Sequence, residues 1–340
     1  MKHTFGKALL SLGAAAVIAA GSPTVATAQQ ELRFTTSVPA NSFIYANILE
    51  VWAQRVTDDS EGTITVRMFP AGTLGRDASG HLDMLRNGIV DLAYFIPGYT
   101  PGAMTEATIV ELPNVVPSAT VGSLAATQMV DNGSWTGQGM EGVKILGMFS
   151  TAPTLLTTSE PVTSLEDVAN MNLRGAGPTL LASIEALGAT PVGGLTAPQI
   201  AEALSRGLLD GTINEWVALT IFGISQTAHN HLNVNMGASA IMVGMNRQTY
   251  DSLPAAAQAA IDRNSGEAFA RLWGEEFDAR IDAFRSAAEQ DADRTFTTLS
   301  DEEQARWAER LQTVTDHWIE STPNGQALYD AYVAAIAAAE

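Results

Sequence analysis

An isolated arginine is the residue best placed to bind a ligand. Between Arg86 and Arg206 the chain has only two cationic side chains, Lys144 and Arg174. Arg174 ends a short apolar stretch, and Gly175-Ala176-Gly177-Pro178 follows it at once. This pattern predicts a strand that stops and a helix that begins, with the guanidinium at the strand's carboxyl end, where ligands bind in open α/β sheets. Because a guanidinium offers a planar fork of donors to a carboxylate or phosphate, we expect an anion receptor with one principal cation.

Two other motifs suggest chemistry that their surroundings do not support. Gly137-Gln138-Gly139-Met140-Glu141-Gly142 matches the dinucleotide fingerprint G-x-G-x-x-G, but it follows a predicted helix and precedes a predicted strand, the reverse of what that site needs. His229-Asn230-His231 offers two imidazoles without a third metal ligand nearby. The chain also lacks G-x-S-x-G, H-E-x-x-H and a phosphate-binding loop. We therefore predict no enzyme activity, no cofactor and no metal site.

The first 28 residues have the features of a cleavable signal peptide. Lys2 and Lys7 give a basic start, an apolar run follows from Ala8 to Ala20, and Ala26-Thr27-Ala28 forms an A-x-A cleavage site. The run is shorter than the roughly 20 apolar residues of a membrane span, which argues against a retained anchor. We expect export to the periplasm, cleavage near Ala28 and no direct membrane insertion.

The exported chain is strongly acidic and has no cysteine. Removal of the leader takes away two lysines and no acids, which leaves 16 cationic against 37 anionic side chains and a net charge of −21. Such a surface repels nucleic acid and anionic lipid, so neither is an expected partner. It also repels an anionic solute, and binding one therefore requires a concentrated positive site. The lack of cysteine excludes disulfides, thiolate metal sites and a cysteine nucleophile.

Hydrophobic periodicity predicts alternating strands and helices around Arg174. A β-α-β-α-β series comes first and a second alternating series follows, which predicts an α/β fold with right-handed crossovers. The predicted strands cover 31–38, 63–70, 90–96, 143–149, 154–158, 171–176, 190–194 and 209–216. The predicted helices cover 42–60, 77–87, 121–132, 164–169, 178–187 and 198–206.

The C-terminal part is predicted to be nearly all helix, with one long amphipathic helix over 262–288. Its apolar stripe is predicted to be core and consists of Phe269, Trp273, Phe277, Ile281 and Phe284. A helix of this length spans about 40 Å, so we expect it to run across two lobes.

Several segments resemble one family of solute receptors. Three of them resemble the signature of solute-binding proteins of tripartite ATP-independent periplasmic (TRAP) transporters, of the dicarboxylate-receptor type. They are Arg174, Gly188-Ala189-Thr190-Pro191 and Leu208-Leu209-Asp210-Gly211-Thr212-Ile213-Asn214-Glu215-Trp216. The other stretches that resemble this family are 69–75, 87–93, 159–167, 245–246 and 253–254. The resemblance covers nearly the whole exported chain.

The resemblance implies a two-lobe periplasmic binding protein of type II-like architecture. Each lobe would contain a mixed sheet flanked by helices, and crossing strands and a long C-terminal spanning helix would join the lobes. The lobes would close on one organic anion. The receptor would then deliver this anion to the membrane permease subunits. We expect the first lobe to contain 31–152 and 240–280, and the second 153–239 and 281–340. The family's carboxylate-binding arginine falls on Arg174, and its asparagine, which helps to hold that carboxylate, falls on Asn214.

Two departures from the family pattern bear on the solute. Many members have a second arginine near Thr154 and an aromatic residue where this chain has Ala197. Their absence favours a less polar, apolar or aromatic monocarboxylate over a sugar acid or a C4-dicarboxylate. Trp216, Tyr94 and Phe95 are candidates for the pocket wall, and each is equally consistent with a core role. The predicted site consists of Arg174, Asn214, Trp216, Tyr94, Phe95 and Thr154.

Other interpretations stay open at this point. The same chain would serve as the exported receptor of a sensor system, and the solute could be a C4-dicarboxylate. A secreted hydrolase or lyase is disfavoured by the missing motifs. A neutral or cationic solute would require Arg174 to be locked in an ion pair with Glu166 or Asp167. Asn214 is also compatible with a simple turn residue.

Overall fold

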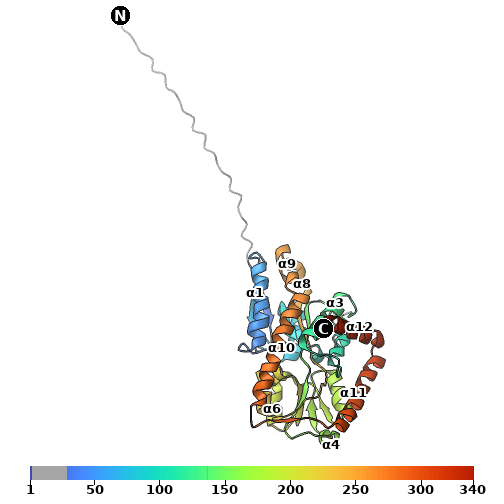
Figure 1. The fold of residues 1–340 in the computed structure, drawn as a ribbon. Helices are drawn as coiled ribbons and strands as arrows, with labels where there is room; N and C mark the ends of the chain where they lie inside the picture. The colour runs from blue at the N-terminus through green and yellow to red at the C-terminus, as the bar shows by residue number, and fades with distance from the viewer. Residues whose placement is uncertain (2–28, 101, 136) are drawn as a thin grey trace.

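The computed structural model describes residues 1, 29–100, 102–135 and 137–340. The predicted signal peptide lies outside the described residues apart from Met1. The described chain forms two mixed sheets flanked by helices (Figure 1). We call each sheet with its packed helices a lobe, the first lobe being the one that contains the N-terminal strand. The predicted α/β class is confirmed.

The first lobe is built on a five-stranded sheet with the order β2-β1-β3-β10-β4. β1 pairs in parallel with β2 and β3, whereas β10 lies antiparallel between β3 and β4. The strands are β1 (Gln30–Thr35), β2 (Ile64–Phe69), β3 (Leu92–Phe95), β4 (Val143–Ser150) and β10 (Ala240–Asn246). The helices between them are α1 (Glu50–Asp59), preceded by a π-helical segment over Ile44–Leu49, α2 (His81–Arg86) and α3 (Ala119–Asp131).

The second lobe is built on a six-stranded sheet with the order β11-β9-β5-β8-β6-β7. Its strands are β5 (Leu155–Thr158), β6 (Asn172–Arg174), β7 (Thr190–Val192), β8 (Gly211–Asn214), β9 (Asn230–Leu232) and β11 (Thr295–Thr297). Its short helices are α4 (Leu165–Val168), α5 (Pro178–Ala186), α6 (Ile200–Ser205) and α7 (Trp216–Ile221). Because β6 ends at Arg174 and α5 begins at Pro178, the arginine lies at the carboxyl end of its strand, as its sequence context predicts.

Two chain segments cross between the sheets and are bonded to one another. The first joins β4 to β5 and the second joins β9 to β10. The backbone N–H of Thr151 donates to the carbonyl of Ser239 at 3.0 Å, and the N–H of Thr154 donates to the carbonyl of Gly237 at 2.8 Å. The Thr154 hydroxyl also donates to the Gly237 carbonyl, at 2.8 Å. These bonds tie the two crossing segments into one connection between the lobes.

The long helix α10 (Glu267–Glu289) is the other connection between the lobes. It packs on α3 and β4 of the first lobe and on α7 of the second, and in Figure 1 it runs from beside α1 to the level of α6. The prediction that this helix begins at Asp262 is wrong. A shorter helix, α9 (Ala255–Arg263), ends there, and the chain turns at Gly266 with φ +59° before α10 begins.

Phe269, Trp273 and Phe277 of the apolar stripe of α10 lie in the core, as predicted, whereas Ile281 and Phe284 are partly buried and pack against the core. The Trp52 and Phe269 rings stack with centroids 5.2 Å apart, and the Phe149 and Trp273 rings stack at 4.9 Å. Phe277 is likewise buried. This packing fixes α10 against the first lobe before its later turns reach the second.

Two C-terminal helices complete the chain, α11 (Asp301–Ser321) and α12 (Gly325–Ala339). α11 packs on α5 of the second lobe, whereas α12 packs on α3 of the first lobe (Figure 1). The predicted lobe limits stay a prediction, and these contacts distribute the C-terminal helices over both lobes. α8 (Arg247–Ser252) follows β10. None of the helices in the described part of the chain combines the length and apolarity that a bilayer crossing requires.

Candidate functional site

A small cavity of about 40 Å³ lies between the two lobes. Tyr94 and Tyr99 line it from the first lobe, and Arg174 and Asn214 line it from the second. Most of the remaining wall is apolar and includes Val38, Ile44, Ile221, Phe222, Ile241 and Phe277. The cavity therefore combines one guanidinium with an apolar wall at the interface where the lobes meet.

Arg174 is fully buried, with a relative exposure of 0%. Its Nε and Nη2 atoms donate to the carbonyl of Leu195 at 2.9 and 2.8 Å, and Nη2 also donates to the Tyr99 hydroxyl at 3.0 Å. Nη1 has no hydrogen-bond partner among the described residues. Buried polar groups are nearly always bonded, so an unpaired guanidinium nitrogen beside a cavity is a strong sign of a ligand-facing group. The two hydrogens of Nη1 are the part of Arg174 that remains for an anion.

Tyr99 bridges the two lobes at this site. It ends a short 3-10 turn, Pro97–Tyr99, that follows β3 of the first lobe. Its hydroxyl oxygen accepts from Arg174 Nη2 and from the backbone N–H of Ala197, both at 3.0 Å and both from the second lobe. A phenol has one hydrogen to donate in addition to its acceptor capacity. Since the oxygen is used as an acceptor twice, its own hydrogen is left for a third group in the cavity.

The side chain of Asn214 is oriented by its neighbour on β8. The Thr212 hydroxyl donates to the Asn214 amide oxygen at 2.7 Å. This bond occupies the acceptor end of the amide and leaves the NH₂ group, which has two hydrogens, as its remaining polar end. Arg174, Tyr99 and Asn214 thus bring three kinds of hydrogen-bond donor to one cavity.

Glu215 is an acidic residue in the same cavity lining. Its exposure is 5%, and one carboxylate oxygen accepts from the backbone N–H of Ala218 at 2.9 Å in the first turn of α7. Burial raises the pKa of the Glu215 carboxyl to about 7, while backbone hydrogen bonds from Ala218 and Val217 lower it. The cavity is therefore lined by a guanidinium, which can bind an anion, and by a carboxyl group, which can bind a cation or accept a hydrogen bond.

A second buried glutamate, Glu111, lies near Arg174 but is not part of the cavity lining. It ends the 3-10 segment Thr105–Glu111 of the first lobe and accepts from the backbone N–H of Thr179 at 3.2 Å, in the first turn of α5. Burial raises the pKa of Glu111 to about 7, while backbone hydrogen bonds from Leu180 and Thr179 and the charge of Arg174 lower it. Its carboxylate is an interlobe contact rather than a cavity group.

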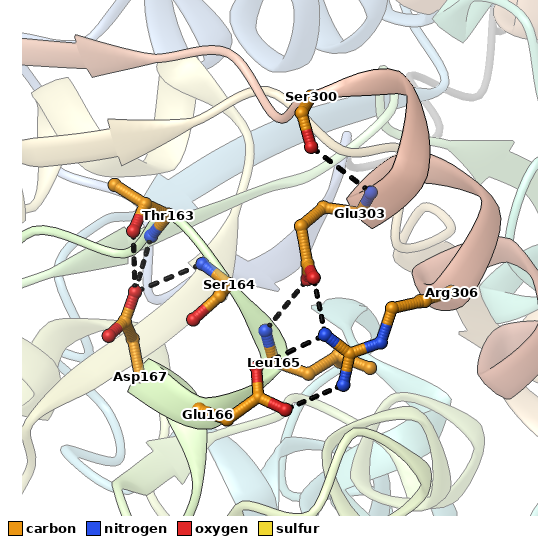
Figure 2. Close-up of polar contacts among 8 residues, drawn as sticks. All are labelled: Thr163, Ser164, Leu165, Glu166, Asp167, Ser300, Glu303 and Arg306. Atoms are coloured by element: carbon orange, nitrogen blue, oxygen red, sulfur yellow. Dashed lines mark hydrogen bonds and ion pairs between the residues drawn. The ribbon is translucent and has the colours of Figure 1, made fainter.

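Glu166 and Asp167, the two acidic residues considered as ion-pair partners of Arg174, bond to other groups. Figure 2 shows that Glu166 faces Arg306, with Arg306 Nη2 and Glu166 Oε1 2.6 Å apart. The hydrogen bond from Arg306 lowers the pKa of Glu166 to about 2. Asp167 accepts from the backbone N–H groups of Thr163 and Ser164 at 2.8 and 3.0 Å, which caps α4 (Figure 2). Neither carboxylate is paired with Arg174, so the alternative in which the arginine is locked by one of them is wrong.

The family of the protein follows from a match over most of its length. Residues 34–322 match the bacterial extracellular solute-binding protein family 7, DctP. The chain belongs to this family. The ectoine-binding periplasmic protein TeaA of Halomonas elongata is 25% identical over 332 residues, which are 91% of this chain and 94% of TeaA.

Two solved TRAP solute-binding proteins have closely similar folds. One, from a marine metagenome and specific for aromatic acid ligands, is in complex with metahydroxyphenylacetate. It is 29% identical with a TM-score of 0.85, over 92% of this chain and 100% of that chain. The other, from Rhodoferax ferrireducens, contained copurified benzoate; it is 25% identical with a TM-score of 0.84, over 91% of this chain and 98% of that chain. These relatives are solute receptors, not enzymes, and the two-lobe architecture expected of a TRAP receptor is confirmed.

This receptor brings together only some of its predicted site residues. Arg174, Asn214 and Tyr94 line the cavity, whereas Trp216, Phe95 and Thr154 lie outside its lining. Phe95 follows Tyr94 on β3 and therefore points to the opposite face of the sheet, where it packs in a first-lobe core cluster. The ligand roles of the cavity-lining residues stay predictions.

The other two predicted residues have structural contacts. The prediction that a strand extends to Trp216 is wrong, because β8 ends at Asn214 and Trp216 is the first residue of α7. Its ring packs on His231 and Phe296, with centroids 4.7 and 5.8 Å away. Thr154 forms the crossing-segment bond to Gly237 described above.

Sequence reasoning missed Tyr99 and Glu215 as site residues. Glu215 directly follows Asn214, so its position next to a predicted ligand was a usable signal. Tyr99 lies in a proline- and glycine-rich passage, and only the folded chain places it against a strand 75 residues away. Its contact is long-range and leaves no periodic trace in the sequence.

His231 of the His229-Asn230-His231 motif is part of the second-lobe core. Its ring packs against Trp216 and Phe296, and its Nδ1 lies 3.0 Å from the Thr157 hydroxyl. Burial lowers the pKa of His231 to about 4, with smaller contributions from Arg294 and His229. Across the described ranges, no group of three or more His, Cys, Asp or Glu side chains is arranged to hold a metal.

Replacing Tyr99 with phenylalanine is expected to weaken solute binding about tenfold. The substitution leaves a hydrogen of Arg174 Nη2 and the Ala197 N–H without their acceptor, and an unsatisfied buried donor costs roughly 1–3 kcal/mol. Because these bonds join the two lobes, we expect the loss of affinity to appear mostly as faster dissociation of the solute. Stopped-flow fluorescence measures the dissociation rate. Tyr250→Phe is the matched control, since that hydroxyl bonds to Asp262 at an exposed position. Equal dissociation rates in the Tyr99 variant and the wild type would rule out this interlobe role.

Proposed function

We propose that this protein is the periplasmic receptor of a TRAP transporter for an organic monocarboxylate with an apolar, aromatic body. The observation that carries the proposal is Arg174 Nη1, a buried guanidinium nitrogen without a hydrogen-bond partner in the described part of the chain, next to an otherwise largely apolar cavity. Export with cleavage near Ala28 and delivery of the solute to the membrane permease belong to the same proposal.

The donors around the cavity support a carboxylate as the bound group. Arg174 Nη2 and Nε are already used by Tyr99 and Leu195, so the solute oxygen that approaches the guanidinium would bind at Nη1. The Tyr99 hydroxyl hydrogen and the Asn214 amide are the further donors. Charge-assisted hydrogen bonds of this kind are about twice as strong as neutral ones, and a cavity shielded from water strengthens them further.

The apolar wall supports a solute with an aromatic or otherwise apolar body. Ile44, Phe222, Ile241 and Phe277 present hydrocarbon surface, and Arg174 is the one arginine among the described residues of the wall. Burial of apolar area favours such a solute over one that carries many hydroxyl groups, which would find few partners here. The two solved relatives described above, which are 29% and 25% identical to this chain, have aromatic acids bound. Their ligands are consistent with this class of solute.

Binding is proposed to work through closure of the lobes. Tyr99 comes from the first lobe and Arg174 and Asn214 from the second, so a solute carboxylate in contact with all three favours the closed arrangement. A ligand shifts a conformational equilibrium only by its differential affinity for the two states. The carboxylate supplies that difference because its partners converge only when the lobes meet.

Native mass spectrometry of gently purified protein, followed by a thermal-shift panel, tests the proposed function. We expect a copurified aromatic acid and a mature chain that begins after Ala28. With solute at a hundred times its dissociation constant, we expect benzoate, 3-hydroxybenzoate or mandelate to raise Tm by about 5 °C or more. Succinate and ectoine complete the panel. If either of these stabilised the protein more than every aromatic acid, the proposed solute class would be wrong.

A further inference from the structure

Glu215 is the unexplained residue of the cavity. It is 5% exposed, it lines the same cavity as Arg174, and within the described residues it forms no ion pair. A buried carboxylate without a cationic partner is costly for the fold, so such a residue usually has a functional reason to be there.

Helix capping explains only part of this arrangement. Glu215 precedes α7, and one of its oxygens accepts from the Ala218 N–H at 2.9 Å. An asparagine, aspartate, serine or threonine is the usual N-cap residue and does the same with a shorter side chain. The capping bond does anchor the carboxylate, however, so its position relative to Arg174 is fixed by α7 rather than by a mobile side chain.

Glu215 shares the cavity wall with a second polar group, the Tyr94 hydroxyl. Burial, followed by the neighbouring Tyr99 and Glu215 groups, raises the pKa of the Tyr94 hydroxyl. Tyr94 lines the cavity from the first lobe and Glu215 lines it from the second, so the carboxylate and the phenol border the same small space. A solute bound by Arg174 would therefore experience this charge along its body.

The two charged residues together define what the cavity accepts. One anionic group on the solute is balanced by Arg174. The described residues of the cavity wall contain no second cation. A second anionic group would therefore meet Glu215 without a balancing charge, and like charges in a poorly solvated cavity repel strongly. A hydroxyl or ammonium group at the same place would instead donate to the carboxylate.

We propose that Glu215 is a specificity-determining residue that excludes dianionic solutes and accepts a hydrogen bond from a donor group on the monocarboxylate held by Arg174. The proposal rests on the proposed function, because it assumes that a carboxylate binds at Arg174. It narrows the solute class to monocarboxylates that carry a hydroxyl or ammonium group away from the carboxylate.

A series of substituted benzoates tests this role. The solutes are benzoate, 3- and 4-hydroxybenzoate, and the corresponding dianions isophthalate and terephthalate, measured by isothermal titration calorimetry at pH 8 so that Glu215 is mostly ionised. In the wild type we expect at least one hydroxybenzoate to bind more tightly than benzoate, and both dianions to bind at least tenfold more weakly. In Glu215→Gln, the amide oxygen still caps α7. We expect the ratio of hydroxybenzoate affinity to benzoate affinity to fall about fivefold or more. We expect the ratio of benzoate affinity to the affinity of the better-binding dianion to fall about tenfold.

Glu111→Gln is the matched control. Glu111 is equally buried, caps the first turn of α5 and has a pKa raised to the same value, but it is not part of the cavity lining. We expect it to leave the affinity ratio of dianion to monoanion within about threefold of the wild type. A Glu215→Gln protein that binds all five solutes with unchanged ratios would show that Glu215 is only a cap and would overturn this inference alone. A wild type that binds none of the five solutes, benzoate included, would overturn both the inference and the proposed aromatic solute.

Discussion

Replacing Arg174 with methionine is expected to weaken binding of the solute by about two to three orders of magnitude. Loss of one partner from a buried, hydrogen-bonded charge pair costs roughly 2–5 kcal/mol, and about 1.4 kcal/mol corresponds to a factor of ten in affinity. The guanidinium is 0% exposed and its Nη1 has no partner among the residues that the structure describes, so water cannot readily replace it as the partner of a carboxylate. Isothermal titration calorimetry with the best solute of the panel measures the change.

Methionine is chosen because Arg174 also has a structural role. Its Nε and Nη2 bonds to the Leu195 carbonyl hold the segment that leads into α6, and an unbranched apolar side chain keeps the buried stem filled. Thermal unfolding without solute reports any loss of stability separately from binding. Arg294→Met is the control, because that side chain is 12% exposed and pairs with Asp291 at 3.0 Å, away from the cavity.

A neutral analogue of the solute completes the test. The carboxamide of the best solute is expected to bind the wild type weakly and to bind the Arg174 variant about equally well. The variant then loses affinity for the acid but not for the amide. If acid and amide lost affinity by the same factor, the arginine would act through the fold rather than through the carboxylate.

The local features of this protein were predictable from its sequence because they depend on neighbouring residues. The strand that ends at Arg174 and the helix that begins at Pro178 follow from an apolar run, a glycine turn and a proline in the first helical turn. The core role of Phe269, Trp273 and Phe277 follows from helical spacing alone. The family signature added Asn214, which lines the cavity with Arg174.

The remaining features depend on contacts between distant segments. β10 lies between β3 and β4 although it follows β4 by about ninety residues along the chain, and no periodic pattern encodes that pairing. Tyr99 and the Leu195 carbonyl bond two nitrogens of Arg174 and leave the third, Nη1, without a partner in the described part of the chain. The turn that separates α9 from α10 depends on one glycine, Gly266, within a pattern that is otherwise helical.

Substituting alanine for Gly98 is expected to weaken solute binding about 10- to 100-fold by hindering closure. Gly98 directly precedes Tyr99 and packs on the second lobe at Gly177. A Cβ atom at Gly98 would lie 2.9 Å from the Gly177 Cα and 3.1 Å from a Glu111 carboxylate oxygen. The first of these neighbours is backbone, so the clash is relieved only by moving the lobes apart, and overpacking of this kind costs roughly 1–3 kcal/mol.

Small-angle X-ray scattering and calorimetry on the same samples measure this effect. With saturating solute, the wild type is expected to contract, whereas Gly98→Ala is expected to keep a larger radius of gyration and to release the solute faster. Gly80→Ala is the matched control, because a Cβ there meets no atom within 4 Å and its φ of −82° suits any residue. The backbone clash with Gly177 exists only where the lobes touch, whereas the Glu111 carboxylate is the end of a first-lobe side chain and can shift by a few tenths of an ångström. The unliganded Gly98 variant should therefore unfold at nearly the wild-type temperature. A variant that contracts fully with solute and keeps its affinity within twofold would mean that the Gly98–Gly177 contact is not required for closure.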